Sequence, residues 1–137
     1  MKCYLLDTNV VSEARKMKPH GAVLAWLREV EDKNIYLSAV TIGELQMGVE
    51  QTRRQDPTKA AEIELWIDQL AASYQVLPMD TACFREWARL MSGRTNDLIE
   101  DAMIAATARI HQLTVATRNE RDFAHLGVPV VNPFSAR

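Results

Sequence analysis

The sequence predicts an α/β fold in which helices flank a central, mostly parallel β-sheet. Short apolar segments alternate along the chain with segments of helical periodicity, and strands separated by helices are usually joined by parallel crossovers. The chain has 137 residues, of which 47% are hydrophobic and 25% are charged. This length and composition are typical of one globular domain with its own core. No linker, repeat or low-complexity stretch divides the sequence, so a single domain over residues 1–137 is expected.

The first half of the chain is expected to hold two strands and three helices. The apolar run 3–6 is assigned as the first strand, and a short helix over 10–15 follows it. Apolar side chains at i, i+3, i+4 and i+7 predict an amphipathic helix over residues 23–30. Residues 35–37 form the second strand, and a helix over 40–51 comes next.

The next segment is expected to form a helix, a strand and a second helix. Asp56 followed by Pro57 is typical of a helix start, and the apolar spacing continues over 63–70. Residues 75–77 form a short third strand. Thr81 is assigned as the cap of the following helix. The expected buried face of that helix consists of Phe84, Trp87, Ala88 and Met91.

The last part of the chain is expected to hold a helix over 98–112 and strands over 114–116 and 129–131. Residues Ala102–Ala108 carry no charge, and small or apolar side chains cover every face of this helical stretch. A helix that is apolar all round is buried. Asp101 directly precedes this stretch. It is therefore expected to be desolvated in part, and to require a hydrogen bond, an ion pair or a metal.

Charge and cysteine usage exclude several classes of protein. The chain has 16 Lys and Arg against 18 Asp and Glu, a net charge of −2, so a strongly basic nucleic-acid binder is excluded and any phosphate contact needs a local basic patch. Cys3 and Cys83 form neither a CxxC pair nor a disulfide framework, which fits a reducing compartment. No apolar run approaches the ~20 residues of a membrane span. A soluble, cytoplasmic protein with no membrane association is expected.

Acidic and amide side chains follow the predicted strands. Asp7 comes directly after the first strand, Glu44 lies one turn into the helix after the second, and Asn119 and Asp122 follow the fourth. Each has an alternative explanation: a helix cap at Asp7, a solvated surface acid at Glu44, a favourable first-turn charge at Asp101 and a polar loop at Asn119.

These side chains are expected to converge, because the carboxyl ends of parallel strands meet at one edge of a sheet. Several carboxylates in one pocket repel each other unless a cation or a shared proton compensates them. Oxygen ligands select hard cations, so Mg²⁺ or Mn²⁺ is the expected occupant. The three histidines are scattered along the chain, which argues against zinc.

Five segments carry a resemblance to a known family. They resemble PIN domains, especially the VapC-type and FitB-like toxins, and they occur in the same order over nearly the whole chain. The segments are Leu5–Glu13, Leu37–Leu45, Asp101–Ala108, Val115–Phe123 and Val131–Phe134.

The resemblance implies a PIN-like three-layer sandwich and a Mg²⁺- or Mn²⁺-dependent endoribonuclease, the toxin of a type II toxin–antitoxin pair. It further implies a homodimer that is inhibited by a cognate antitoxin. This antitoxin is expected to be a small DNA-binding protein encoded next to the toxin.

Carried over by position, Asp7, Glu44 and Asp101 match the first three acids of the family. Many relatives have Asp where this chain has Asn119, and others have Asn followed three residues later by Asp, as in Asp122 here. The expected catalytic residues are Asp7, Glu44, Asp101 and Asp122, with the metal on Asp7 and Asp101. Thr8, Thr117 and Asn119 are expected to support them, and Arg118 and Arg121 to contact RNA phosphates.

The expected mechanism is attack by a metal-activated water, which leaves 5′-phosphate and 3′-hydroxyl ends. Two alternatives compete with it. A haloacid-dehalogenase-like phosphatase needs a second Asp two residues after the first, where this chain has Asn9. The other alternative is a catalytically weak PIN-fold binding protein that acts through its antitoxin partner, and the uncharged Asn119 keeps it open.

Overall fold

A five-stranded parallel β-sheet forms the centre of the computed structural model, which describes residues 2–135. The strand order is β3-β2-β1-β4-β5, and every neighbouring pair is parallel. The predicted parallel sheet is therefore confirmed, with β1 at its centre. The strands are β1 (Tyr4–Leu6), β2 (Ile35–Ser38), β3 (Gln75–Leu77), β4 (Thr114–Ala116) and β5 (Val130–Val131).

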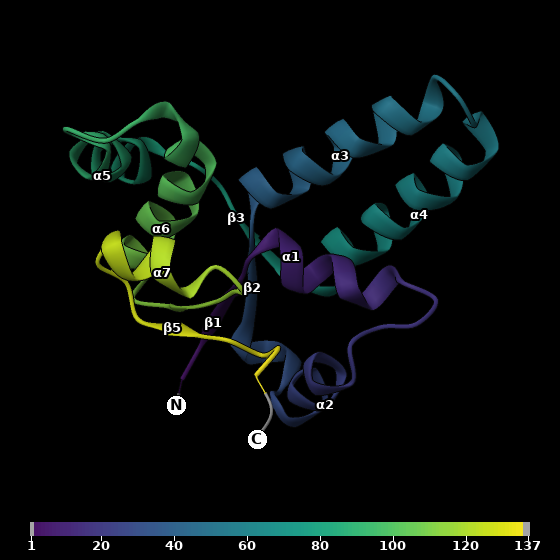
Figure 1. The fold of residues 1–137 in the computed structure, drawn as a ribbon, viewed down its shortest axis with the longest axis horizontal. Coiled ribbons are helices and arrows are strands. Elements are labelled where there is room, and N and C mark those ends of the chain that lie inside the picture. The colour runs from purple at the N-terminus through teal and green to yellow at the C-terminus, as the bar shows by residue number, and fades with distance from the viewer. Residues whose placement is uncertain (1, 136–137) are drawn as a thin grey trace.

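Helices cover both faces of the sheet, so the molecule has three layers (Figure 1). Helices α5, α6 and α7 lie on one side, and α1, α2 and the α3–α4 hairpin lie on the other. A 3₁₀ turn over Ser12–Arg15 continues α1. The helices are α1 (Thr8–Val11), α2 (Gly21–Glu29), α3 (Ala39–Arg53), α4 (Pro57–Ser73), α5 (Thr81–Met91), α6 (Ile99–His111) and α7 (Glu120–His125).

The alternating side chains of β1 feed two hydrophobic cores. Leu5 packs into the core on the α6 side, and Leu6 packs into the core that contains the buried Trp26 of α2. In α6, Ala102 and residues 104–108 are all buried, as the absence of charge in this stretch predicts. Within residues 2–135 no helix is long and apolar enough to cross a membrane.

Helix α5 differs from its predicted form in its cap and in its buried face. The cap is Asp80, not Thr81, because the Asp80 carboxylate accepts the Cys83 backbone N–H at 3.0 Å. The buried stripe contains Cys83, and Trp87, one helical turn later, is partly buried. Phe84 is 44% exposed. One residue turns a helix by about 100°, and Cys83 is small enough for α5 to approach α6 closely at that point. The assignment of Phe84 and Ala88 to the core was wrong.

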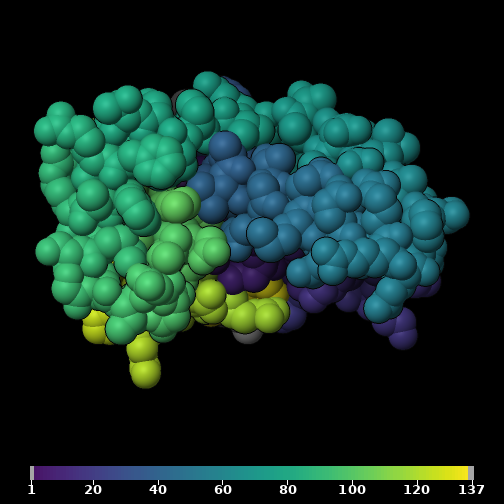
Figure 2. Space-filling model, turned by 90° about the horizontal axis from the view of Figure 1, so that it is seen from above, coloured from purple at the N-terminus to yellow at the C-terminus, as the bar shows by residue number. Residues whose placement is uncertain are grey.

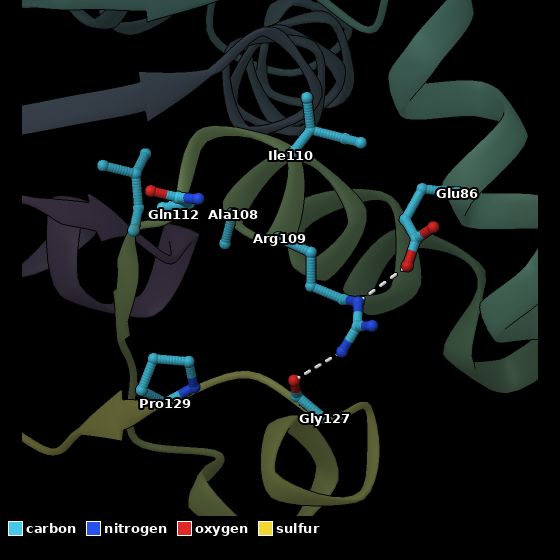
Figure 3. A pocket seen from close by; sticks show the side chains of 8 residues that line it. Glu86, Ala108, Arg109, Ile110, Gln112, Gly127 and Pro129 are labelled. Carbon is cyan, nitrogen blue, oxygen red and sulfur yellow. Dashed lines mark hydrogen bonds and ion pairs between the residues drawn. The ribbon is translucent and has the colours of Figure 1, made fainter.

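Arg109, in the last turn of α6, joins three parts of the chain (Figure 3). Its Nε donates to Glu86 Oε2 of α5 at 2.6 Å, and its Nη1 donates to the Gly127 carbonyl at 2.7 Å. Gly127 has φ +73°, and a Cβ at this position would lie 2.8 Å from Nη1. The positive φ of Gly127 favours glycine in the turn between α7 and β5, and a larger side chain there would displace the end of the Arg109 side chain. Glu86, Arg109 and Gly127 line a pocket of about 500 Å³.

Replacement of Arg109 by methionine is expected to lower the free energy of unfolding by about 1–2 kcal/mol, because it removes a charge-assisted hydrogen bond and leaves the Gly127 carbonyl without its donor. Urea denaturation measures the effect. Arg89 binds the other oxygen of Glu86 but is 60% exposed. Arg89→Met is therefore the matched control, with an expected change within about 0.5 kcal/mol. Equal losses in the two variants would contradict the proposed role of Arg109.

Candidate active site

Four chain segments meet at the carboxyl edge of the sheet. The parallel register aligns Leu6 of β1 with Leu37 of β2 and Ala116 of β4, so the residues that follow these strands lie at the same edge. The Asp7 N–H extends the pairing by donating to the Ala116 carbonyl at 2.9 Å. Figure 2 views the molecule from this end, and the purple N-terminal segment is visible between the blue of α3, the green of α6 and the yellow C-terminal segment.

Asp7 is buried and held by three hydrogen bonds. It is 4% exposed. Its Oδ1 accepts the Thr8 backbone N–H at 2.8 Å, and its Oδ2 accepts the Thr117 hydroxyl at 2.8 Å and the Asn9 side-chain amide at 3.1 Å. Burial raises the pKa of Asp7, and these hydrogen bonds oppose the increase. Asp7 is also the N-cap of α1, so the predicted helix cap is confirmed, and its role as a catalytic residue and metal ligand stays a prediction.

Glu44 projects from α3 toward the same site. The Thr8 hydroxyl donates to Glu44 Oε1 at 2.8 Å and lies 3.2 Å from the hydroxyl of the buried Thr41. Burial raises the pKa of Glu44, and the negative charges of Asp7 and Glu100 raise it further. The carboxylate is therefore oriented by Thr8 and repelled by its neighbours, which does not fit the alternative of a freely solvated surface acid.

Asp101 carries the largest perturbation of the site. Burial, followed by the charges of Asp7, Asp122, Glu44 and Glu100, raises its pKa from 3.8 to about 6. Within residues 2–135 no hydrogen-bond donor or cationic partner compensates its carboxylate. Asp101 is half-buried in the first turn of α6. The charge of Asp101 therefore has no compensating partner among the described residues of the site.

The donor chemistry of the site fits a hard divalent cation. The acids offer only oxygen atoms, and no positive charge contributes to the raised pKa values of Asp7, Glu44 and Asp101. Mg²⁺ and Mn²⁺ prefer such ligands. No group of three acidic, histidine or cysteine side chains in the described part of the chain is close enough to form a complete cluster by itself. An ion at this site would therefore take its remaining ligands from water and substrate oxygens.

Asn119 and Asp122 contribute in different ways. The Asn119 backbone N–H donates to the Thr117 hydroxyl at 2.9 Å, and Asn119 occupies the N-cap position of α7 without a capping bond from its side chain. Asp122 is exposed in the first turn of α7, and its charge reaches Asp101. Of the two candidates for the fourth position, only Asp122 adds negative charge to the site.

The two arginines predicted to contact phosphate lie at the rim. The Arg118 backbone N–H donates to Asn9 Oδ1 at 3.2 Å, and its guanidinium lies over the Phe134 ring. Arg121 is exposed in α7. Neither arginine forms an ion pair with Asp7, Glu44 or Asp101 in the described structure. Their role as phosphate contacts remains a prediction.

Comparison with known proteins assigns the fold to a family. The model of the PIN domain matches residues 4–129. The chain belongs to the PIN domain family. It is similar to "VapC ribonuclease Y4jK" of Sinorhizobium fredii, with 36% identity over 95% of this chain and 96% of the relative. It is also similar to "Toxin FitB" of Neisseria gonorrhoeae, with 37% identity over 95% of this chain and 97% of the relative.

Solved structures support the same PIN fold. The structure described as FitAcB from Neisseria gonorrhoeae superposes with a TM-score of 0.86 and 34% identity, covering 97% of this chain and 99% of that chain. A structure of FitAB bound to a DNA fragment gives a TM-score of 0.84 and 32% identity, covering 98% and 97% of the two chains. The three-layer PIN-like architecture predicted from the sequence is confirmed.

Two residues of this PIN site were missed as functional candidates. Thr41 was not singled out from the sequence, and its buried hydroxyl lies 3.2 Å from the Thr8 hydroxyl. Glu100 was not singled out, although its charge acts on both Glu44 and Asp101. A signal existed for Thr41, one helical turn before Glu44, because i−3 neighbours share a helix face.

Proposed function

We propose that this PIN-domain protein is the toxin of a type II toxin–antitoxin pair and acts as a Mg²⁺- or Mn²⁺-dependent endoribonuclease. The observation that carries the proposal is the convergence of three carboxylates without a cationic partner, Asp7, Glu44 and Asp101, at the carboxyl edge of the sheet. The names of the relatives, a VapC ribonuclease and the toxin FitB, point to the same activity. The similarity to each of these two relatives covers 95% of this chain.

In the proposed mechanism Asp7 and Asp101 would hold the ion, and Asp122 adds negative charge beside Asp101. A bound divalent ion supplies stabilisation of phosphate charge and a lowered pKa of coordinated water. Thr117 and Asn9 fix the orientation of the Asp7 carboxylate. Glu44, oriented by Thr8, accepts a hydrogen bond from the attacking water and directs it to phosphorus. Because water is the nucleophile, the products carry 5′-phosphate and 3′-hydroxyl ends.

We further propose that a cognate antitoxin holds this activity in check. The solved relatives include FitAcB and FitAB bound to a DNA fragment, and FitB is the name of a similar toxin. By this similarity the partner is a small DNA-binding protein encoded next to the toxin, and the toxin itself forms a homodimer. The pair is expected to act in the cytoplasm, where its RNA substrate is found.

Cleavage of total RNA by the purified, antitoxin-free protein tests the proposed activity. Cleavage is expected with Mg²⁺ and with Mn²⁺. It is expected to disappear with EDTA, because negatively charged carboxylates cannot polarise a phosphate without a metal ion. The new 5′ ends should be ligated without prior phosphorylation. Products with 2′,3′-cyclic phosphate ends would contradict water as the nucleophile, and cleavage that persists in EDTA would contradict the metal.

One observation favours the second candidate function, a catalytically weak PIN-fold binding protein that acts through its antitoxin. Asn119 carries no charge, and its side chain is exposed at the rim. The variant Asn119→Asp separates the two functions. Cleavage that appears only in this variant would show that the natural chain lacks a ligand charge, whereas equal cleavage by both proteins would assign the fourth position to Asp122.

A further inference from the structure

Beside the carboxylates, three side chains form a stack of aromatic and cationic groups. The Arg118 guanidinium carbon lies 3.8 Å from the centroid of the Phe134 ring. The His20 ring meets the same ring edge-on, with centroids 5.2 Å apart and an interplanar angle of 65°. We call Arg118, Phe134 and His20 the rim stack. Its members come from three separate parts of the chain, and neither Phe134 nor His20 was predicted to be a site residue.

The rim stack rests on fixed supports. The Phe134 backbone N–H donates to Asn132 Oδ1 at 2.9 Å, and its ring is partly buried against the core that contains Leu6. Glu13 is 4% exposed, and its Oε1 accepts the His20 backbone N–H at 2.9 Å. Its other carboxylate oxygen accepts Lys16 Nζ. The ring that carries Arg118 is therefore held by the core and flanked by an anchored loop.

A short path of hydrogen bonds ties the rim stack to Asp7. Arg118 directly follows Thr117, whose hydroxyl donates to Asp7. The Arg118 backbone N–H donates to Asn9 Oδ1, and the Asn9 amide donates to Asp7 Oδ2 at 3.1 Å. The backbone of Arg118 is thus fixed beside the proposed metal ligand. Its guanidinium forms no ion pair with the carboxylates of the site in the described structure.

Stacking decides which part of Arg118 remains available. When a guanidinium stacks on an aromatic ring, one of its own faces is covered, but the N–H groups at its edges stay free. These N–H groups match the geometry of a phosphate. The protein has a net charge of −2, and its site gathers carboxylates that repel RNA. A cation held at the rim offsets that repulsion where the backbone of the substrate enters.

We propose that Phe134 is a positioning residue that holds the Arg118 guanidinium for a phosphate of single-stranded RNA next to the scissile bond. This inference rests on the proposed ribonuclease function and names how its substrate is held. Arg118 makes the contact, Phe134 restricts the side chain in advance, and His20 packs against the ring. The stack therefore contributes to substrate binding and not to the chemical step.

Steady-state cleavage of a short RNA tests the inference with four variants: Arg118→Gln, Phe134→Leu, Phe134→Tyr and the double variant Arg118→Gln/Phe134→Leu. Phe134→Leu is expected to raise KM by roughly 3–10-fold with kcat unchanged, because a cation–π contact of this kind is lost. Phe134→Tyr retains the ring and is expected to keep the KM of the natural chain. Arg118→Gln is expected to raise KM at least as much, and the double variant no further. Phe84→Leu, an exposed aromatic on α5, is the matched control.

A spectroscopic readout separates positioning from loss of structure. Stacking on Phe134 is expected to shift the NMR signal of the Arg118 Nε–H upfield by the ring current. Phe134→Leu removes that shift, while the remaining backbone amide signals report an intact fold. An unshifted Arg118 signal in the natural chain would overturn the stack.

The outcomes distinguish this inference from the proposed function. Metal-dependent cleavage with KM unchanged in Phe134→Leu, or with additive effects in the double variant, overturns the rim stack alone. If no RNA is cleaved, the ribonuclease proposal fails, and RNA affinity in an Asp101→Asn background then decides whether the stack binds RNA. Loss of antitoxin binding with unchanged RNA affinity would assign the stack to the protein partner and overturn the inference.

Discussion

Asp101→Asn is expected to reduce RNA cleavage by roughly 10²–10³-fold or more, which is the range seen when a central electrostatic group is removed from an active site. Asparagine has nearly the same shape but brings no charge to a divalent ion. The negative charges of the other carboxylates of the site all raise the pKa of Asp101. Its replacement therefore removes a ligand charge without a cavity, and the rate of RNA cleavage in Mg²⁺ measures the loss.

The same substitution is expected to stabilise the metal-free protein by roughly 1–2 kcal/mol, a magnitude that allows for solvent screening of a half-buried carboxylate. The reason is the raised pKa of Asp101, since folding buries its carboxylate in part and places its charge among negative neighbours. Urea denaturation in EDTA at pH 7.5 measures this gain. Loss of activity together with a gain of stability would mark Asp101 as a functional residue that the fold tolerates at a cost.

Asp68→Asn on α4 is the matched control, because it makes the same change at an exposed helix position. It should leave cleavage unchanged and alter stability by no more than about 0.5 kcal/mol. If Asp101→Asn cleaves RNA as fast as the natural chain, Asp101 does not hold the ion. If it is less stable than the natural chain in EDTA, its carboxylate makes favourable contacts, contrary to the repulsion described above.

The fold was predictable because its signals are local. Each strand is a short apolar run, each long helix shows its periodicity, and the uncharged stretch after Asp101 predicts the burial of α6. The convergence of Asp7 and Glu44 followed from one general rule, that parallel strands deliver their carboxyl ends to the same edge. Asp101 reaches that edge at the start of α6, which follows α5 and not a strand. Neither conclusion needed a side-chain contact.

The details that escaped prediction depend on contacts between distant residues. Thr117 orients Asp7 across a separation of 110 residues, and Arg118 stacks on Phe134 only because β4 and the C-terminal segment lie side by side. In α5, Cys83 and Phe84 are both apolar, so the apolar periodicity does not predict which of them is buried. Packing against α6 decides it. Glu100 stands beside Asp101 in the sequence, but its effect on Glu44 depends on how α6 lies against α3.

A fall in pH from 8 to 5.5 is expected to stabilise the metal-free protein and to weaken its stabilisation by Mg²⁺ or Mn²⁺. The pKa of Asp101 is about 6 in the folded chain against an ordinary value of 3.8, and burial raises the pKa of Asp7 and of Glu44 in the same direction. Between these two values the folded state binds a proton that the unfolded state does not. Stability therefore rises as the pH falls through this window.

Metal binding has the opposite dependence, because an ion must displace the same proton. Melting temperatures measured at several pH values, in EDTA and in excess Mn²⁺, separate the two effects. The melting temperature in EDTA is expected to rise toward low pH, and the increment from Mn²⁺ is expected to shrink, with its midpoint near pH 6. Cleavage should lose half of its maximal rate in the same region, since it needs the deprotonated carboxylates.

Asp101→Asn provides the decisive comparison, because it removes the group whose pKa changes most. Its melting temperature in EDTA should depend less on pH, and its increment from Mn²⁺ should be small throughout. Carboxylates with a lowered pKa, such as Glu86 beside Arg109 and Asp80 at the start of α5, destabilise the fold only when protonated at lower pH. They therefore do not offset the gain above pH 5. A Mn²⁺ increment that is constant from pH 8 to 5.5 would show that the ion does not bind at these carboxylates.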